Sequence, residues 1–194
     1  MSKVSLCIYC GSRPGEMPAY TEAARTVGKE IGRRGWQLVY GGGRAGLMGV
    51  VADAALEAGA TVVGVIPYSL MNCELGHRGL SELHVVETMH QRKTMMAERS
   101  DAFLALPGGI GTFEELFEVW TWRQLGYHDK PLGLLNVAGY YDALLRFLQH
   151  SKEQGFMATA QTDLLEVDGD PLALIERLGD LAKRATAPDD YRKI

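Results

Sequence analysis

The chain has 194 residues, of which 46% are hydrophobic, and its formal net charge at pH 7 is −4. This length can bury one sizeable core, so we expect a single domain over residues 1–185 and a polar, loosely tied C-terminal tail over residues 186–194. The acidic balance argues against binding nucleic acid or a membrane surface through bulk charge. No apolar run approaches the length that spans a bilayer, so we expect a cytoplasmic protein that binds a small ligand.

Hydrophobic runs alternate along the chain with segments of helical periodicity. The sequence predicts strands over residues 4–9, 37–40, 61–66, 83–87, 101–106, 131–137 and 164–167. It predicts helices over residues 20–34, 47–57, 90–99, 112–125, 140–153 and 171–185. Strands rich in Val, Leu and Ile that alternate with helices form a parallel sheet covered on both faces. The predicted fold is therefore α/β, a doubly wound, Rossmann-like and mostly parallel sheet of about seven strands.

Cys7 and Cys10 form a C-x-x-C pair in and just after the first predicted strand. Residues three apart on a strand point to opposite faces of the sheet, so we expect ordinary burial rather than redox or zinc chemistry. The five histidines show no spacing typical of metal ligands. We therefore expect no metal and no cofactor.

Three glycine-rich turns follow predicted strands: 10-CGSR-13, 41-GGGRAGLMG-49 and 107-PGGIG-111. The carboxyl ends of parallel strands meet at one edge of a sheet, so these turns should form one nucleotide-sized crevice. In the third turn, backbone N–H groups that no side chain shields open a helix, an arrangement that suits phosphate or carboxylate. Further residues expected in the pocket are Gly11, Ser12, Gly42, Gly43 and Met48.

Two other interpretations of these turns remain open. Gly41, Gly43 and Gly46 fit the dinucleotide pattern G-x-G-x-x-G, although the next strand leads into Pro67 rather than the acidic residue that holds ribose hydroxyls. A nicotinamide-dependent oxidoreductase is therefore the weaker alternative. Thr112 and Glu115 have the spacing of a capping box that merely starts a helix.

Basic residues precede the third turn. On a helix, Arg92 and Arg99 are seven residues apart and lie near one face, while Lys93 is turned by about 100° from Arg92. Such groups could clamp a phosphate in the pocket. Arg99 could equally pair with Glu98 on a solvated face.

The stretch 107-PGGIGTFEE-115 fits the pattern P-G-G-x-G-T-x-x-E, and the Arg92–Lys93 pair stands before it. Together with YCGS, YGGGRAGLMG, TWRQLGYHDKPLGLLN and GYYDALL, these motifs resemble the Lonely Guy (LOG) family of cytokinin-activating nucleoside monophosphate phosphoribohydrolases over nearly the whole chain. The resemblance implies hydrolysis of the N-glycosidic bond of a cytokinin riboside 5′-monophosphate or AMP, giving free base and ribose 5-phosphate. It also implies a homodimer.

The resemblance makes Arg92 and Glu115 the catalytic residues. A carboxylate beside the ribose can hold its hydroxyls, stabilise positive charge at the anomeric carbon and orient or deprotonate water. The substrate-binding and phosphate-binding residues that the resemblance implies are Glu74, Lys93, Gly108, Gly109, Ile110, Gly111, Thr112 and Thr121.

Competing functions make different use of these motifs. Relatives with the same motifs carry the label lysine decarboxylase, which implies a pyridoxal Schiff-base lysine, and Lys93 is the lysine within the two-part motif. The pattern around it suits phosphate better. A non-catalytic nucleotide-binding or carrier module would need the glycine turn and the basic pair, but the charge of Glu115 would oppose a bound anion.

The predicted helix after the third turn supports self-association. Its apolar residues run around most of its circumference, so one face can pack on the sheet while the rest needs another cover. We expect a second copy of the chain to cover part of it. The residues concerned are Phe113, Leu116, Phe117, Val119, Trp120 and Trp122.

Overall fold

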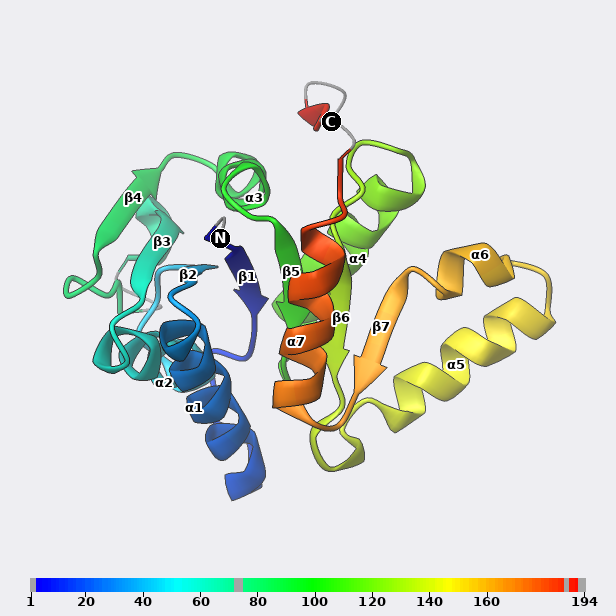
Figure 1. Ribbon diagram of the computed structural model, residues 1–194, viewed down its shortest axis with the longest axis horizontal. Helices are drawn as coiled ribbons and strands as arrows, with labels where there is room; N and C mark the ends of the chain where they lie inside the picture. The colour runs from blue at the N-terminus through cyan, green and yellow to red at the C-terminus, as the bar shows by residue number, and fades with distance from the viewer. Residues whose placement is uncertain (1–2, 72–74, 187–188, 192–194) are drawn as a thin grey trace.

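The structure, a computed structural model, describes residues 3–71, 75–186 and 189–191. Its centre is a sheet of seven strands in the order β4-β3-β2-β1-β5-β6-β7, and every neighbouring pair is parallel (Figure 1). The predicted doubly wound parallel sheet is thus confirmed. The strands are β1 (Ser5–Tyr9), β2 (Gln37–Tyr40), β3 (Thr61–Pro67), β4 (Glu82–Val86), β5 (Ala102–Ala105), β6 (Leu132–Leu135) and β7 (Leu165–Asp168).

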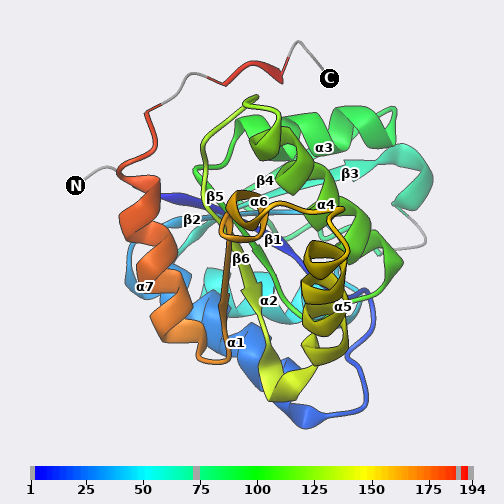
Figure 2. The same ribbon diagram turned by 90° about the vertical axis from the view of Figure 1, so that its right-hand side faces the viewer.

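Helices cover both faces of this sheet, as predicted. Figure 2 shows α1, α2 and α7 on one side and α3, α4 and α5 on the other. The four-residue helix α6 was not predicted because a single turn is too short to show a periodic pattern. The helices are α1 (Pro18–Arg33), α2 (Gly46–Glu57), α3 (Met89–Glu98), α4 (Ile110–Gln124), α5 (Asp142–Glu153), α6 (Thr159–Thr162) and α7 (Pro171–Ala182).

Side chains alternate along each strand between two hydrophobic clusters, one under each helix layer. On β5, Leu104 packs in the α1 and α2 cluster, whereas Phe103 packs in the α3 and α4 cluster, and both are fully buried. Cys10 lies in the first cluster and Cys7 in the second, which confirms that the C-x-x-C pair points to opposite faces. Burial raises the pKa of the Cys7 thiol to about 12, so the thiol stays protonated and unreactive.

The strand order places a topological switch point between β1 and β5. The chain winds outward from β1 through β2 and β3 to β4, then returns to β5 on the other side of β1 and continues to β7. The loops that leave β1 and β5 therefore diverge to opposite sides and open a crevice at the carboxyl edge of the sheet. Within the described residues, the helices are too short or too polar to cross a membrane.

The C-terminal segment differs from its prediction as a loosely tied tail. Tyr191 is only 8% exposed, and its ring meets that of Trp122 in an edge contact at 5.8 Å between centroids. The Asp189 carboxylate lies 2.5 Å from Lys130 Nζ, and the Asp190 N–H donates to the Tyr127 carbonyl at 2.9 Å. The prediction is wrong for residues 189–191, because one buried aromatic ring and one ion pair hold an otherwise polar segment.

The apolar residues of α4 are largely covered by the chain itself. Leu116, Val119, Trp120 and Trp122 are all buried, and the Trp120 indole N–H donates to the Gln161 carbonyl at 2.9 Å. Neighbouring segments of the same chain therefore cover much of the surface for which we expected a second copy. The expected homodimer stays a prediction on other grounds.

Candidate active site at the carboxyl edge of the sheet

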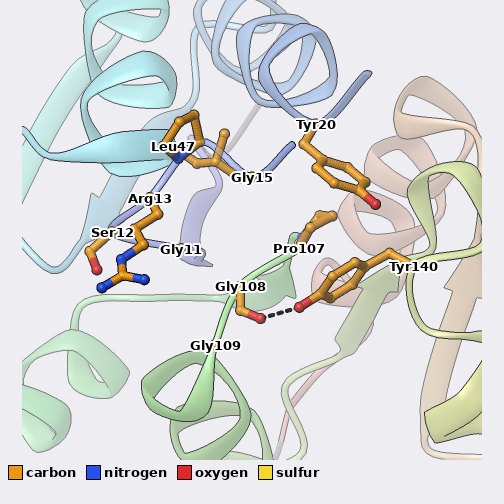
Figure 3. Close-up of a pocket in the computed structure, with 11 residues that line it drawn as sticks. Gly11, Ser12, Arg13, Gly15, Tyr20, Leu47, Pro107, Gly108, Gly109 and Tyr140 are labelled. Carbon is orange, nitrogen blue, oxygen red and sulfur yellow. Dashed lines mark hydrogen bonds between the residues drawn. The ribbon is translucent and has the colours of Figure 1, made fainter. Parts of the chain in front are cut away.

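A cavity of about 440 Å³ lies at the switch point between β1 and β5 (Figure 3). It is formed by the turns after these two strands, the starts of α1 and α2, and the connection that follows β6. Ser12 and Arg13 lie at one end of the drawn cavity, and the Tyr20 and Tyr140 rings lie at the other (Figure 3). The lining residues are Gly11, Ser12, Arg13, Pro14, Gly15, Tyr20, Leu47, Pro107, Gly108, Gly109 and Tyr140.

The third glycine turn delivers the N-terminus of α4 to this cavity. Gly109 is the N-cap in extended conformation, and no side chain caps the first turn of the helix within the described chain. The N–H groups of Ile110, Gly111 and Thr112 therefore lack intrahelical acceptors and carry the positive end of the helix dipole. Ile110 itself is 81% exposed, so its side chain shields little of this surface.

The three glycines of this turn are present for different reasons. A Cβ on Gly108 would lie 2.1 Å from Thr112 Oγ1, so packing alone excludes a side chain there. A Cβ on Gly109 or Gly111 would meet no described atom within 4 Å, and neither residue has a positive φ. Neither local packing nor backbone conformation explains these two glycines. Open space over exposed N–H groups is what close approach of a ligand to the backbone needs.

The alternative in which Thr112 and Glu115 form a capping box at the start of this helix is wrong. Helix α4 begins at Ile110, so Thr112 lies inside its first turn, where it is 4% exposed and packs against Gly108. Glu115 is then about one and a half turns into the helix and is too far along to act as a capping partner. A capping box does open α3, where Thr88 and Gln91 bond reciprocally. The T-x-x-Q spacing in the sequence was the signal for it.

Arg92 is a buried cation at the same edge of the sheet. Its side chain leaves the first turn of α3, and the residue is 4% exposed. The guanidinium donates from Nη2 to the Gly41 carbonyl at 3.0 Å and from Nε to the Val65 carbonyl at 3.2 Å. A Cβ on Gly41 would lie 2.0 Å from Arg92 Nη2, so this glycine makes room for the arginine. The first glycine of the apparent dinucleotide pattern thus has a role within the chain.

Glu115 lies half-buried on α4, near the end of β1. Burial raises the pKa of the Tyr9 hydroxyl and the Cys7 thiol, and the negative charge of Glu115 raises both further. The carboxylate therefore lies close to β1. Glu115 and Arg92 come from two helices on the same face, both of which begin at the carboxyl edge.

Lys93 is already engaged by two carboxylates. Its Nζ lies 2.6 Å from Glu114 Oε1 and 2.9 Å from the Glu118 carboxylate, which ties α3 to α4. Partial burial alone would lower the pKa of Lys93, but these ion pairs raise it above its ordinary value. A lysine that forms a Schiff base must lose its proton, so Lys93 does not fit the pyridoxal role that the decarboxylase label implies.

Several other predicted pocket residues do not line the cavity. Gly42 adopts a positive φ and packs against Ile66, Gly43 bridges to Gly76, and Met48 is buried in the hydrophobic core. Their roles in the structure are conformational or in packing.

Arg99 lies at the opposite edge of the sheet. It follows the last residue of α3, and its Nη1 is 3.4 Å from the carboxylate of Glu82, the first residue of β4. This exposed ion pair fits a surface role rather than a place in the pocket.

The structure does not bring Thr121 to the cavity. Thr121 is exposed on α4, where its hydroxyl donates to the Phe117 carbonyl at 2.7 Å. Thr121 is six positions after Glu115, which places the two about 9 Å apart along the helix and about 120° apart around it. Glu74 lies outside the described residues.

Three side chains of the cavity wall were not predicted as site residues from the sequence: Arg13, Tyr20 and Tyr140. Arg13 stood in the first glycine turn, where position after a strand was the available signal. Tyr140 belongs to the GYYDALL motif, which resembles the family but does not itself indicate a place in the site. No spacing in the sequence indicates that Tyr20 and Tyr140 face the crevice that the glycine turns form.

Two tyrosines hold the carbonyl side of the third glycine turn. The hydroxyl of Tyr140 donates to the Gly108 carbonyl, and that of Tyr141 donates to the Leu106 carbonyl at 2.6 Å, on either side of Pro107. The left-handed conformations of Ala138 and Gly139 bring these tyrosines back over the turn. Because the two tyrosine hydroxyls hold these carbonyl groups, the N–H groups of the turn are left at the start of α4.

Comparisons with known proteins identify the family. A family model described as possible lysine decarboxylase matches residues 48–178. The cytokinin riboside 5′-monophosphate phosphoribohydrolase of Rhodococcoides fascians is 53% identical over 157 residues, which cover 80% of this chain and 79% of that protein. The cytokinin riboside 5′-monophosphate phosphoribohydrolase LOG3 of Arabidopsis thaliana is 47% identical over 177 residues, 91% of this chain and 82% of that protein.

A solved structure shares the fold at lower identity. The molybdenum cofactor binding protein from Rippkaea orientalis matches with a TM-score of 0.71 and 20% identity, over 93% of this chain and 98% of that one. This likeness supports the architecture alone. The match to the family model and the two closely similar phosphoribohydrolases show that the chain belongs to the Lonely Guy (LOG) family.

Proposed function

We propose that this chain hydrolyses the N-glycosidic bond of a nucleoside 5′-monophosphate, releasing the base and ribose 5-phosphate. The observation that carries the proposal is the uncapped start of α4, where Gly109 and Gly111 leave room over free N–H groups. These groups suit a phosphate, and Glu115 follows on the same helix. The names of the similar phosphoribohydrolases support the same reaction.

In the proposed reaction Glu115 acts on the ribose. As the bond between the anomeric carbon and the base nitrogen breaks, its electron pair leaves with the base, and positive charge develops on the sugar. The Glu115 carboxylate stabilises that charge and accepts a proton from the water that attacks the anomeric carbon. The departing base takes up a proton from solvent.

Arg92 provides a fixed positive charge at this edge. Two backbone carbonyls hold its guanidinium, so the group loses little freedom when a substrate binds. A buried cation close to the ribose favours ionised carboxylates and anionic substrate groups. We assign it the role of catalytic partner of Glu115.

The position of Thr121 on α4 bears on how the chain assembles. Its side chain lies on another face of α4 from Glu115, so it cannot face the same cavity from the same chain. If Thr121 contacts substrate, as the resemblance implies, it does so in the site of a second copy. We propose a homodimer in which α4 lies at the subunit interface.

The proposed reaction is tested with three substrates. Purified protein is incubated with AMP, with isopentenyladenosine 5′-monophosphate and with adenosine, and released base is measured. We expect base from at least one monophosphate and very little from adenosine, because binding energy from the phosphate contributes to catalysis. Equal rates for AMP and adenosine would contradict the phosphate site, and no release from either monophosphate would contradict the enzymatic function.

A further inference from the structure

Three basic side chains are candidates to bind the substrate phosphate: Lys93, Arg92 and Arg13. Lys93, the expected cation, is held by Glu114 and Glu118, so its surroundings carry more negative than positive charge. Arg92 is buried and donates to two backbone carbonyls. We propose that Arg13, in the turn after β1, is the side chain that binds the 5′-phosphate of the substrate, an inference that rests on the proposed function.

Arg13 lines the same cavity as the start of α4. It shares this cavity with Ser12 on its own turn and with Gly108 and Gly109 on the other side of the switch point. Its side chain is exposed and forms no ion pair with any residue that the structure describes. Arg13 therefore brings an uncompensated positive charge to the cavity, whereas Lys93 does not.

The backbone of Arg13 is fixed in place. The Leu47 N–H donates to the Gly11 carbonyl at 3.0 Å, and the Gly11 N–H donates to the Pro107 carbonyl at 3.0 Å. A Cβ on Gly46 would lie 2.3 Å from the Arg13 nitrogen, so the start of α2 packs directly against this turn. Only the side chain of Arg13 must become ordered when a ligand binds, which limits the entropy lost.

The two ends of the cavity differ in chemistry, and this difference predicts the orientation of the bound ligand. The end with Ser12 and Arg13 supplies a hydroxyl and a planar guanidinium, which can bind two phosphate oxygens at once (Figure 3). The other end is formed by the Tyr20 and Tyr140 rings, which offer no positive charge (Figure 3). Gly108 and Gly109 line the same cavity and lead into α4, so a phosphate bound by Arg13 would approach the start of the helix that also carries Glu115.

The test compares two arginines at the same edge. Arg13→Gln removes the proposed phosphate ligand. Arg44→Gln removes the same charge from the neighbouring turn, where the Arg44 side chain is 61% exposed and lies 3.6 Å from Asp53. Binding of ribose 5-phosphate and AMP to both variants is measured by calorimetry at two salt concentrations, and thermal unfolding confirms that each variant is folded.

We expect Arg13→Gln to weaken binding of ribose 5-phosphate and AMP by about ten- to a hundredfold, because a charged hydrogen bond is lost. The remaining affinity should depend less on salt concentration than that of the wild type. Arg44→Gln should weaken binding by less than about threefold. Equal losses in the two variants, undiminished binding by Arg13→Gln, or no binding of ribose 5-phosphate to the wild-type protein would each overturn the inference. Calorimetry needs no turnover, so Arg13-dependent binding without base release would leave this inference standing while the proposed function failed.

Discussion

The glycines of the site fall into two groups: those whose neighbours leave no room for a Cβ and those that face open space. Gly41 and Gly108 have neighbours that exclude a Cβ, while Gly109 and Gly111 face open space. In the sequence all four belong to glycine-rich turns, and a glycine pattern does not reveal whether the chain or a ligand occupies the space beside it. Only atoms brought from distant positions, such as Arg92 against Gly41, make that distinction.

Substitutions at Gly108 and Gly109 should therefore behave differently. Gly109→Ala is expected to keep the wild-type melting temperature but to lower kcat/KM for AMP at least about tenfold, because the methyl group occupies the space in which the phosphate approaches the backbone. Gly108→Ala forces a clash with Thr112 and should lower the melting temperature instead. Thermal unfolding and base release on both variants provide the check. Wild-type kcat/KM in Gly109→Ala would show that no ligand uses this space.

At the scale of elements, the site depends on how the connection after β6 holds the turn after β5. Tyr141 is 1% exposed, and its hydroxyl bonds to the buried Leu106 carbonyl, whereas Tyr140 is 37% exposed. Tyr141→Phe leaves that carbonyl without its partner, at a cost of about 1–3 kcal/mol in the free energy of unfolding. We expect a fall of several degrees in the melting temperature.

Tyr140→Phe is the matched control for Tyr141→Phe. Water can replace the lost hydrogen bond at the more exposed Gly108 carbonyl, so the melting temperature should change less. A drop in melting temperature for Tyr140→Phe as large as that for Tyr141→Phe would contradict this view of the two tyrosines. Calorimetric unfolding of both proteins distinguishes the outcomes.

A buried histidine links α4 to the start of β6 and should make stability depend on pH. The N–H at His128 Nε2 donates to the Val119 carbonyl at 3.0 Å, and Nδ1 accepts from the Lys130 N–H at 3.1 Å, so the ring is neutral. Burial lowers the pKa of His128 from 6.5 to about 4. Between these values the unfolded chain binds a proton that the folded chain does not, so stability present above pH 6.5 is lost as the pH falls toward 4.

The expected loss over that interval is up to about 3 kcal/mol in the free energy of unfolding. Chemical denaturation at a series of pH values measures it. His128→Gln should be less stable at pH 7.5 but should show a flatter decline on acidification. Identical acid profiles for His128→Gln and the wild type would rule out His128 as the source.

For the molecule as a whole, the sequence was sufficient to predict the parallel sheet and its two helical layers. Alternation of apolar strands with helices restricts the topology strongly, and right-handed crossovers leave few arrangements. The sequence could not predict that α4 would be covered by its own chain, because its neighbours at Gln161 and Tyr191 lie far along the sequence. The wall residues Tyr20 and Tyr140 were missed for the same reason.

The proposed homodimer is tested by mixing two inactive variants. Glu115→Gln removes the catalytic carboxylate, and Thr121→Arg blocks the site to which Thr121 contributes. If that site belongs to the partner, mixed dimers contain one site with an intact Glu115 and an intact Thr121, and activity should return on subunit exchange. Persistent inactivity after verified exchange, or a monomer by light scattering at micromolar concentration, would contradict the proposal.

The central claim is that Glu115 acts through its charge on the glycosidic bond, and Glu115→Gln tests it most directly. Glutamine keeps the size of the side chain, and the structure gives Glu115 no capping role that would complicate the result. We predict that base release from AMP or isopentenyladenosine 5′-monophosphate falls by about 10² to 10⁴ in kcat, while calorimetric affinity for AMP and the melting temperature are undiminished. Near wild-type base release by Glu115→Gln would contradict the account.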